Sequence, residues 1–382
     1  MPLETTGRFA SVAGLMSGTS VDGLDLVLVS FRGETPRLKE SWSVRYPARL
    51  RDRLLRCAAG ESTAWELGQL HHDLGRWYAR QAVRCLANTR VQALGVHGQT
   101  VYHHASRGSS ATLQIGEASY LAAALGVPVV SNFRAMDLAL GGQGAPLATL
   151  FHLRAWARRG AHVCVQNLGG IGNVTSLDWR SGSAPRILAF DTGPANMLLD
   201  AAMMESSGGV KTYDRDGRCA ARGQPIWRLV ERWLRADAFL RAHPPKSTGR
   251  ERYGARAFES MSRDLNRESA SLPDRLATLT AFTAATVAEN YARHLPGCPD
   301  TVVLCGGGAR NPVLRIAIQA AIDQRVGHAP VVTSDEWGWP SSTVEGAAFA
   351  LLARERLLRR PGNLPETTGA RRAALCGQVT LP

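Results

Sequence analysis

"GLMSGTSVDGLDLVLVS" (14–30) places glycine, hydroxyl and aspartate residues between two apolar segments near the start of the chain. The segments 11–16 and 24–30 have the leucine and valine content of buried strands, which predicts a β-hairpin. A hairpin turn needs only two to five residues and one or two glycines. Hydroxyl groups beside glycine N–H groups indicate that this tip holds an anion.

Two further glycine-rich tips follow apolar strands. "AHVCVQNLGGIGNVTSLDW" (161–179) is a second hairpin of the same kind, and "TVVLCGGGARNPVL" (301–314) is a strand, three glycines and a helix start. None of the three is a P-loop or a clean dinucleotide motif. Together they favour a nucleotide, because N–H groups in such turns and at a helix start attract phosphate.

The remaining pattern alternates strands and helices, which predicts mixed sheets covered by helices. The paired hairpins predict a duplicated α/β unit with a cleft between its halves. We expect a first domain over 1–130, with 346–382 packing back on it, and a second over 131–345. The expected strands are 38–45, 93–100, 111–116, 127–133 and 186–191; the expected helices are 48–59, 63–90, 119–125, several between 197 and 294, and an amphipathic helix at 342–358.

The bulk composition indicates an ordinary folded protein. The chain has 382 residues, of which 45% are hydrophobic and 20% charged, so it can bury sizeable cores. It has no apolar run of membrane-spanning length, and its first residues lack the order of a signal peptide. The seven dispersed cysteines form no C-x-x-C pair, which favours reduced thiols. We therefore expect a soluble cytoplasmic protein without a membrane partner.

The formal net charge of +13 raises the possibility of a nucleic-acid ligand. Lysine occurs only three times, however, and the arginines are spread through helical stretches rather than gathered in one block. A compositional preference for arginine explains the charge more simply, so we expect no nucleic-acid partner.

Eight motifs together resemble the anhydro-N-acetylmuramic acid kinase family, within the sugar kinase, actin and chaperone ATPase superfamily. They are "GLMSGTSVDGLD", "HGQT", "FRAMDLALGGQGAPL", "NLGGIGNVT", "FDTGPAN", "YDRDG", "PPKSTGRERY" and "CGGGARN". The resemblance covers almost the whole chain. It implies a two-domain α/β fold whose cleft closes on ATP and a sugar, a homodimer, and a role in cell-wall recycling.

In the reaction of that family, water opens the 1,6-anhydro bridge of the sugar at C1 while O6 takes the γ-phosphate of ATP. Because the phosphoryl group captures O6, one general base and a phosphate cradle suffice. The resemblance places this base on Asp191, which follows the apolar strand at 186–190. From the sequence alone, Asp191 is also compatible with a helix-capping or turn aspartate.

The resemblance also implies sugar-binding residues. Glu345 matches the family's sugar-contacting glutamate, although a first-turn glutamate is also favoured by the helix dipole. Arg134 and Asp137 are candidates for substrate contact, with a structural ion pair as the alternative. His97 is assigned to the lining of the pocket, and Asn196 to the substrate.

The ATP site implied by the resemblance contains Gly18, Thr19, Ser20, Val21, Asp22, Gly23, Leu24, Asp25, Gly169, Gly170, Asn173, Gly306, Gly307, Gly308 and Asn311. Asp22 and Asp25 are the candidates for ordering hydrated Mg²⁺. Many members of the superfamily carry an aspartate just before the first tip, where this chain has Met16. The ligands of the metal therefore stay open.

The chain departs from the family at three positions. Asn132 stands where aspartate is common, Ala195 where glycine is common, and Met136 where cell-wall-recycling members carry a basic residue. The missing cation keeps a neutral anhydrosugar such as levoglucosan as an alternative substrate. An ATP-gated binding or regulatory protein on the same scaffold is the alternative outside enzymes, and it would require loss of the base.

Overall fold

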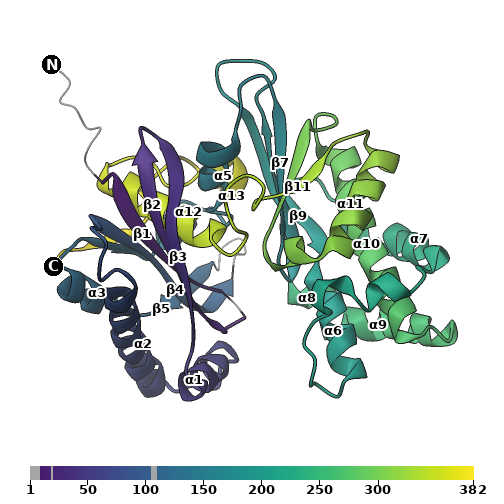
Figure 1. The fold of residues 1–382 in the computed structure, drawn as a ribbon, viewed down its shortest axis with the longest axis horizontal. Coiled ribbons are helices and arrows are strands. Elements are labelled where there is room, and N and C mark those ends of the chain that lie inside the picture. The colour runs from purple at the N-terminus through teal and green to yellow at the C-terminus, as the bar shows by residue number, and fades with distance from the viewer. Residues whose placement is uncertain (1–8, 19, 105–109) are drawn as a thin grey trace. The chain divides into compact units, whose positions relative to one another are not determined.

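The computed structural model describes residues 9–18, 20–104 and 110–382. It divides into two compact units (Figure 1): the first runs to Ala155 and includes Ser342–Pro382, and the second is Trp156–Ser341. The first division thus falls after residue 155, whereas we expected it after residue 130. The intervening segment belongs to the first unit because Arg134 contacts His97 and Asp137 accepts hydrogen bonds from Asn363 and Thr368.

The first unit has a seven-stranded sheet in the described residues, in the order β12-β6-β4-β1-β2-β3 with β5 paired to β4. Its strands are β1 Ser11–Ser17, β2 Gly23–Arg32, β3 Thr35–Arg45, β4 Ala93–His104, β5 Ala111–Ile115, β6 Val129–Ser131 and β12 Gln378–Thr380. Its helices are α1 Ala48–Ala58, α2 Ala64–Cys85, α3 Ser119–Leu125, α4 Ala135–Ala139, α5 Thr149–Trp156 at the boundary, α12 Val344–Leu357 and α13 Pro365–Thr368.

The second unit has a five-stranded sheet in the described residues, in the order β11-β10-β7-β8-β9. Its strands are β7 His162–Leu168, β8 Ile171–Asp178, β9 Arg186–Pro194, β10 Thr301–Cys305 and β11 Val331–Thr333. Its helices are α6 Asn196–Ser206, α7 Trp227–Ala236, α8 Arg250–Tyr253, α9 Ala255–Arg267, α10 Leu272–His294 and α11 Pro312–Arg325.

The two sheets repeat one topology. In the first unit β1 pairs antiparallel with β2 and parallel with β4, and β2 pairs with β3. In the second unit β7 pairs antiparallel with β8 and parallel with β10, and β8 pairs with β9. The parallel strands β6 and β11, which pair with β4 and β10, also correspond. The mixed α/β architecture, predicted from the alternation of strands and helices, and its duplication, predicted from the paired hairpins, are confirmed.

Helix α12 packs on the first sheet through glycines. A Cβ atom on Gly14 of β1 would lie 1.8 Å from the Gly346 carbonyl oxygen, and one on Gly95 of β4 would lie 2.1 Å from that of Phe349. Val344 and the run Gly346–Glu355 of this helix are buried. The predicted amphipathic character of α12 is therefore wrong, because apolar neighbours and the sheet surround the helix on nearly all sides.

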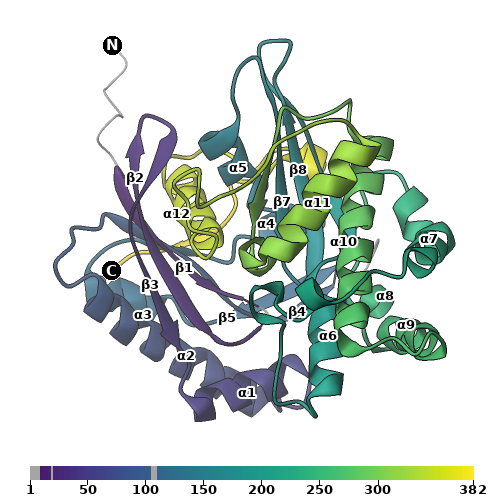
Figure 2. The ribbon, with the colours of Figure 1, turned by 45° about the vertical axis from the view of Figure 1, so that its right-hand side comes forward.

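In the second unit, α10 and α11 lie side by side (Figure 2) and cover one face of the sheet. Leu168, Val174 and Phe190 of the strands pack there against Val287 of α10 and Ile318 of α11. A second apolar cluster joins α6, α7, α9 and α10. Within the described residues, no helix combines the length and the apolar character needed to cross a membrane.

Candidate active site

At Gly18, in the tip between β1 and β2, the described protein leaves room for a side chain. A Cβ atom there would meet only Ser20 Oγ, at 3.6 Å, so the fold itself does not require glycine. The Gly18 carbonyl oxygen accepts hydrogen bonds from Val21 N–H at 3.2 Å and from Gln99 Nε2 at 3.0 Å. Thr19, which was also assigned to the ATP site, lies outside the described residues.

Three buried hydroxyl groups lie at the base of this tip. The Ser17 hydroxyl lies 2.6 Å from that of Tyr78 and accepts from Tyr46 at 2.8 Å. Burial raises the pKa of Tyr46 to about 12, so the cluster is neutral. Tyr46 N–H also donates to the Asp22 carbonyl oxygen at 3.1 Å. The sequence offered no signal for the two tyrosines, which are far from the tip along the chain, whereas Gln99 lies in the quoted "HGQT" motif.

Asp25 occupies β2 just after the tip, opposite Met16 of β1 and Ser43 of β3. The Ser43 hydroxyl donates to Asp25 Oδ1. Glu345 lies in the first turn of α12. The Glu345 side chain is exposed. Partial desolvation by the surrounding protein raises its pKa, the Arg134 guanidinium opposes this rise, and the negative charge of Asp25 adds to it. Asp25, Arg134 and Glu345 thus interact electrostatically in one region of the first unit.

His97 and Arg134 form a direct pair. Arg134 Nη2 lies 2.9 Å from His97 Nε2, and His97 Nδ1 lies 2.8 Å from the Gly98 carbonyl oxygen. This pattern fits a neutral imidazole that donates from Nδ1 and accepts at Nε2. Burial and the nearby Arg134 hold the pKa of His97 well below its usual value. His97 therefore orients Arg134, and its Nε2 lone pair is already engaged.

Asp137 is completely buried. Its Oδ2 accepts from Gly144 N–H at 2.8 Å, and its Oδ1 accepts from Asn363 Nδ2 and Thr368 Oγ1, each at 2.7 Å. These bonds tie the glycine-rich loop after α4 to the C-terminal segment. Arg134 Nη1 donates to the Gly144 carbonyl oxygen of the same loop at 2.7 Å. In this geometry Asp137 shapes the loop beside Arg134 and has no exposed surface to offer a substrate.

The three departures from the family pattern are accommodated locally. Asn132 has φ of 52°, a left-handed conformation that asparagine and aspartate both tolerate. Ala195 has φ of −117°, so glycine is not required there. Met136 is 44% exposed on α4, two residues from Arg134, so its uncharged side chain contributes to the accessible surface.

In the second unit a polar row crosses the sheet. Asn173 of β8 lies opposite both Asn167 of β7 and Asp191 of β9, and Asn167 lies beside Cys305 of β10. Residues directly opposite one another in a sheet share a face, so these four side chains project to the same side. Cys305 Sγ lies 3.8 Å from Asn167 Oδ1. The sequence singled out Asn173 and Asp191 separately; the register brings them together.

Asp191 lies within β9, which continues to Pro194, and not at the end of a strand as expected. The helix-capping alternative fails because α6 begins only at Asn196. The carboxylate accepts one hydrogen bond, from Thr248 N–H to Oδ2 at 2.8 Å. Burial, supported by the charge of Glu251, raises the pKa of Asp191 to about 7, while the Thr248 N–H and Lys246 oppose the rise.

The glycines of the second unit fall into two groups. Cβ atoms on Gly169, Gly170 and Gly307 would meet nothing closer than 3.4 Å. A Cβ on Gly306, by contrast, would lie 2.3 Å from Asn167 Oδ1, and one on Gly308 would lie 2.8 Å from Leu168 Cβ. Close packing therefore explains why positions 306 and 308 are glycine, but it does not explain glycine at positions 169, 170 and 307. At those three positions a ligand has room to approach the backbone.

Two asparagines near these turns are occupied by the backbone. Asn196 Nδ2 donates to the carbonyl oxygens of Leu168 and Gly169, each at 2.9 Å. Asn311 Oδ1 caps α11 by accepting from Val313 N–H at 3.0 Å and from Leu314 N–H. Both side chains fix the shape of the glycine-rich turns in this structure.

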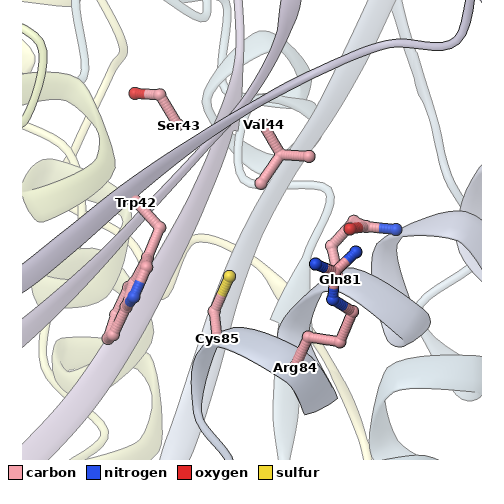
Figure 3. Close-up of a pocket in the computed structure, with 6 residues that line it drawn as sticks. All are labelled: Trp42, Ser43, Val44, Gln81, Arg84 and Cys85. Carbon is pink, nitrogen blue, oxygen red and sulfur yellow. The ribbon is translucent and has the colours of Figure 1, made fainter.

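A separate cavity lies between β3 and the C-terminal part of α2 (Figure 3). It is lined by Trp42, Ser43, Val44, Gln81, Arg84 and Cys85. Its side chains come from the face of β3 that carries Trp42 and Val44, whereas the Ser43 hydroxyl turns away toward Asp25. No residue predicted for the site lines it. Across the described residues, no group of three or more histidine, cysteine, aspartate or glutamate side chains could hold a metal ion.

Solved structures similar to this chain share little sequence with it. One is an activator of 2-hydroxyisocaproyl-CoA dehydratase from Clostridium difficile with bound ADPNP, at 14% identity and a TM-score of 0.43, covering 91% of this chain and 96% of that one. Another is a ROK family glucokinase from Streptomyces griseus with glucose and AMPPNP, at 14% identity and a TM-score of 0.39, covering 90% and 99%.

Sequence relatives are much nearer. An anhydro-N-acetylmuramic acid kinase of Picosynechococcus sp. is 41% identical over 97% of this chain and 99% of its own length. One from Acaryochloris marina is 42% identical over the same shares. The sequence profile described as anhydro-N-acetylmuramic acid kinase matches residues 10–382. The chain therefore belongs to the anhydro-N-acetylmuramic acid kinase family.

Proposed function

We propose that this protein is an ATP-dependent kinase that opens the 1,6-anhydro ring of 1,6-anhydro-N-acetylmuramic acid and phosphorylates O6. The product is N-acetylmuramic acid 6-phosphate. The observation that carries the proposal, beyond family membership, is the half-buried carboxylate of Asp191. Its pKa of about 7 is matched to a base that must accept a proton near neutral pH.

In this mechanism Asp191 takes a proton from water as that water attacks C1 of the sugar. The bond between C1 and O6 breaks, and O6 forms a bond to the γ-phosphorus of ATP as ADP leaves. The phosphoryl group captures O6, so no second carboxylic acid is needed to protonate it. Among the described residues, Thr248 N–H alone donates to the Asp191 carboxylate and holds one of its oxygens; the other oxygen is the one we assign to the water.

The ATP phosphates are assigned to the tip at Gly18–Asp25, and the nucleotide also to the turns at Gly169–Gly170 and Gly306–Gly308. The positions of Gly18 and Gly307 support this assignment. A side chain at either position would not clash with the described protein, but it would block a ligand from approaching the backbone. Gln99 and Asn196 are assigned positioning roles, since their side chains hold the backbone of these turns. Asn311 is assigned one because it caps α11, the helix that follows the third turn.

Mg²⁺ fits the carboxylates near the first tip. The metal is commonly held by one or two carboxylates, water and substrate phosphates rather than by a full protein cage. Asp25, with Asp22 beside it, would hold the hydrated ion, which would neutralise charge on the phosphates. The charge of Asp25 already raises the pKa of Glu345, so this region has negative charge that a cation would balance.

Sugar recognition is assigned to Arg134 and Glu345, with His97 and Asp137 positioning Arg134 and its loop. The lactyl group of muramic acid carries a carboxylate, and Arg134 is the cation we assign to it. Met136, uncharged and 44% exposed, favours a second candidate: a kinase of a neutral anhydrosugar such as levoglucosan. A purely regulatory protein is disfavoured because the base is present.

We also propose that the protein acts in the cytoplasm, in cell-wall recycling, as a homodimer. The use of ATP and the seven cysteines, none of which forms a disulfide bond in the described structure, support a reducing compartment. The homodimer and the recycling role rest on the family alone. Analytical ultracentrifugation tests the dimer directly, and a monomer at micromolar concentration would contradict it.

The decisive assay measures ADP release with anhydro-N-acetylmuramic acid, levoglucosan and N-acetylmuramic acid offered separately. We expect turnover with the first sugar, a 6-phosphorylated product, and none with N-acetylmuramic acid, which has no anhydro bond. A strong preference for levoglucosan would overturn the sugar assignment but keep the kinase. Absence of ADP release with either anhydrosugar would overturn the proposed function.

A further inference from the structure

The cavity between β3 and α2 contains a buried amide that the fold leaves without a hydrogen-bond partner. Gln81 is 9% exposed, and among the described residues its side chain makes no hydrogen bond. Buried polar groups normally have a partner, because an unpaired one lowers the stability of the fold. The Gln81 side chain lines the cavity (Figure 3), so a molecule bound in the cavity can supply the missing partner.

Two more groups that donate hydrogen bonds line the same cavity. In the part of the chain that the structure describes, neither the Trp42 indole nor the Arg84 guanidinium has a hydrogen-bond or ion-pair partner. An indole offers one N–H, a neutral amide two and a guanidinium five. None of the six described lining residues is acidic. The lining is therefore rich in donors and carries a positive charge, a combination that suits an anionic ligand with many oxygen atoms.

The cavity also has an apolar wall. Trp42 and Val44 of β3 pack at the edge of the apolar core of the first unit, and Cys85 of α2 does the same. A half-buried indole offers a flat apolar surface beside its N–H group, so a ring-shaped ligand can pack on it. The volume of the cavity is about 310 Å³, near the lower end of the range of about 300–1,000 Å³ for small-molecule sites. This size favours a ligand with one ring.

We propose that this cavity is a second ligand site, which binds a small anionic sugar, a monosaccharide that carries a phosphate or a carboxylate. Arg84 pairs with the anionic group, Gln81 forms hydrogen bonds with the sugar hydroxyls, and Trp42 packs against the ring. The inference goes beyond the proposed function, because no residue assigned to ATP, to the anhydrosugar or to the base lines this cavity.

Cys85 provides a reporter of binding inside the cavity. Its thiol is half-buried, and Cys298, which is also half-buried, lies in the second unit and serves as an internal control. The experiment measures the alkylation rate of each cysteine by mass spectrometry, with glucose 6-phosphate, glucuronate or glucose added at saturating concentration.

At least one of the two anions should slow the alkylation of Cys85 by about fivefold or more, because only molecules with an empty site react. The rate at Cys298 should stay the same, and neutral glucose should protect neither cysteine. The inference is overturned if neither anion protects Cys85, or if glucose protects it as well as the anions do.

A second experiment tests the residues by calorimetry with the anion that protects Cys85. Arg84→Met should weaken binding by about tenfold or more, because the charged group that pairs with the anion is lost. Arg80→Met is the matched control: it removes an exposed arginine of the same helix that does not line the cavity, and it should leave the affinity unchanged. An equal loss in both variants would show attraction to the general charge of the helix and would overturn the site.

The contact with the sugar ring has its own test. Wild type should bind the sugar anion more tightly than inorganic phosphate, and Trp42→Ala should remove most of that preference. Equal affinity of wild type for the sugar anion and for inorganic phosphate would overturn the assignment to a sugar.

These outcomes are distinguishable from a failure of the proposed function. Arg84→Met should keep wild-type turnover of anhydro-N-acetylmuramic acid, and Asp191→Asn should keep the protection of Cys85. Protection that persists in Arg84→Met but disappears in Arg134→Ala would place the ligand at the proposed sugar site and overturn the inference. If wild type shows no kinase activity but Cys85 is protected, the proposed function fails and the second site stands.

Discussion

Replacing Asp191 by asparagine should make the protein more stable at high pH while abolishing most of its turnover. In the folded chain the pKa of the Asp191 carboxyl group is about 7, whereas the ordinary pKa of an aspartate is 3.8. At a pH between these two pKa values, folding is therefore accompanied by uptake of a proton on Asp191. The free energy of unfolding then falls as the pH rises from about 4 to about 7, because the unfolded chain binds fewer protons there.

The size of this effect follows from the difference between the two pKa values. Each pKa unit is worth about 1.4 kcal/mol, so the ionised carboxylate costs the folded state up to about 4 kcal/mol at pH 8. Asparagine has nearly the same shape, and its Oδ1 can still accept from Thr248 N–H. The variant should be more stable than wild type by about 1.6 kcal/mol at pH 5, where the carboxyl group of the unfolded chain is already ionised, and by about 4 kcal/mol at pH 8. We therefore expect it to melt on the order of 10 °C higher at pH 8 and less than half as much higher at pH 5.

The assay pairs melting curves at pH 5 and pH 8 with turnover at the higher pH. Turnover should fall by roughly 10²–10⁴-fold, the usual contribution of a general base, while ATP binding persists. An equal melting difference at both pH values would refute the reasoning about the half-buried carboxylate. Near-normal turnover would remove Asp191 from the mechanism.

Three further predictions concern the first unit. Gly18→Val should abolish ATP binding without changing the melting temperature, because the nearest atom to its Cβ lies at 3.6 Å; calorimetry showing unchanged affinity would remove the phosphate assignment. Arg134→Ala should raise KM for anhydro-N-acetylmuramic acid far more than for levoglucosan, and an equal response of both sugars would show that Arg134 does not bind the lactyl group. Asp137→Ala should lower the free energy of unfolding by roughly 3 kcal/mol, measured with denaturant, because three buried donors lose their acceptor; a loss below about 1 kcal/mol would contradict that account.

Much of the architecture could be predicted from local sequence. The leucine and valine segments on either side of each polar tip placed the hairpins, and the glycine-bearing tips marked turns that favour phosphate. The same reasoning failed for α12, because a helix that packs against a sheet through Gly14, Gly95 and Gly346 is buried on nearly every side. The close approach of the α12 backbone to the strands of the sheet produces no periodic pattern of apolar residues in the sequence of the helix.

The residues of the candidate site were also predicted only in part from the sequence. Asp191, Arg134 and Glu345 were chosen from motifs, yet Asp137 from the same motif as Arg134 turned out to hold a loop in the interior. Which of two nearby polar side chains faces solvent depends on partners distant in sequence, here Asn363 and Thr368.

The sequence by itself determined the strand and helix content, the repeated hairpins and the family, because these depend on local spacing and on motifs that survive along the chain. Only the tertiary structure decided that Asn167, Asn173 and Asp191 form one row, and that Thr248 N–H donates to the Asp191 carboxylate. Strand register and burial are set by contacts between segments tens of residues apart. The protonation of Asp191 depends on that burial, and therefore on the fold as a whole.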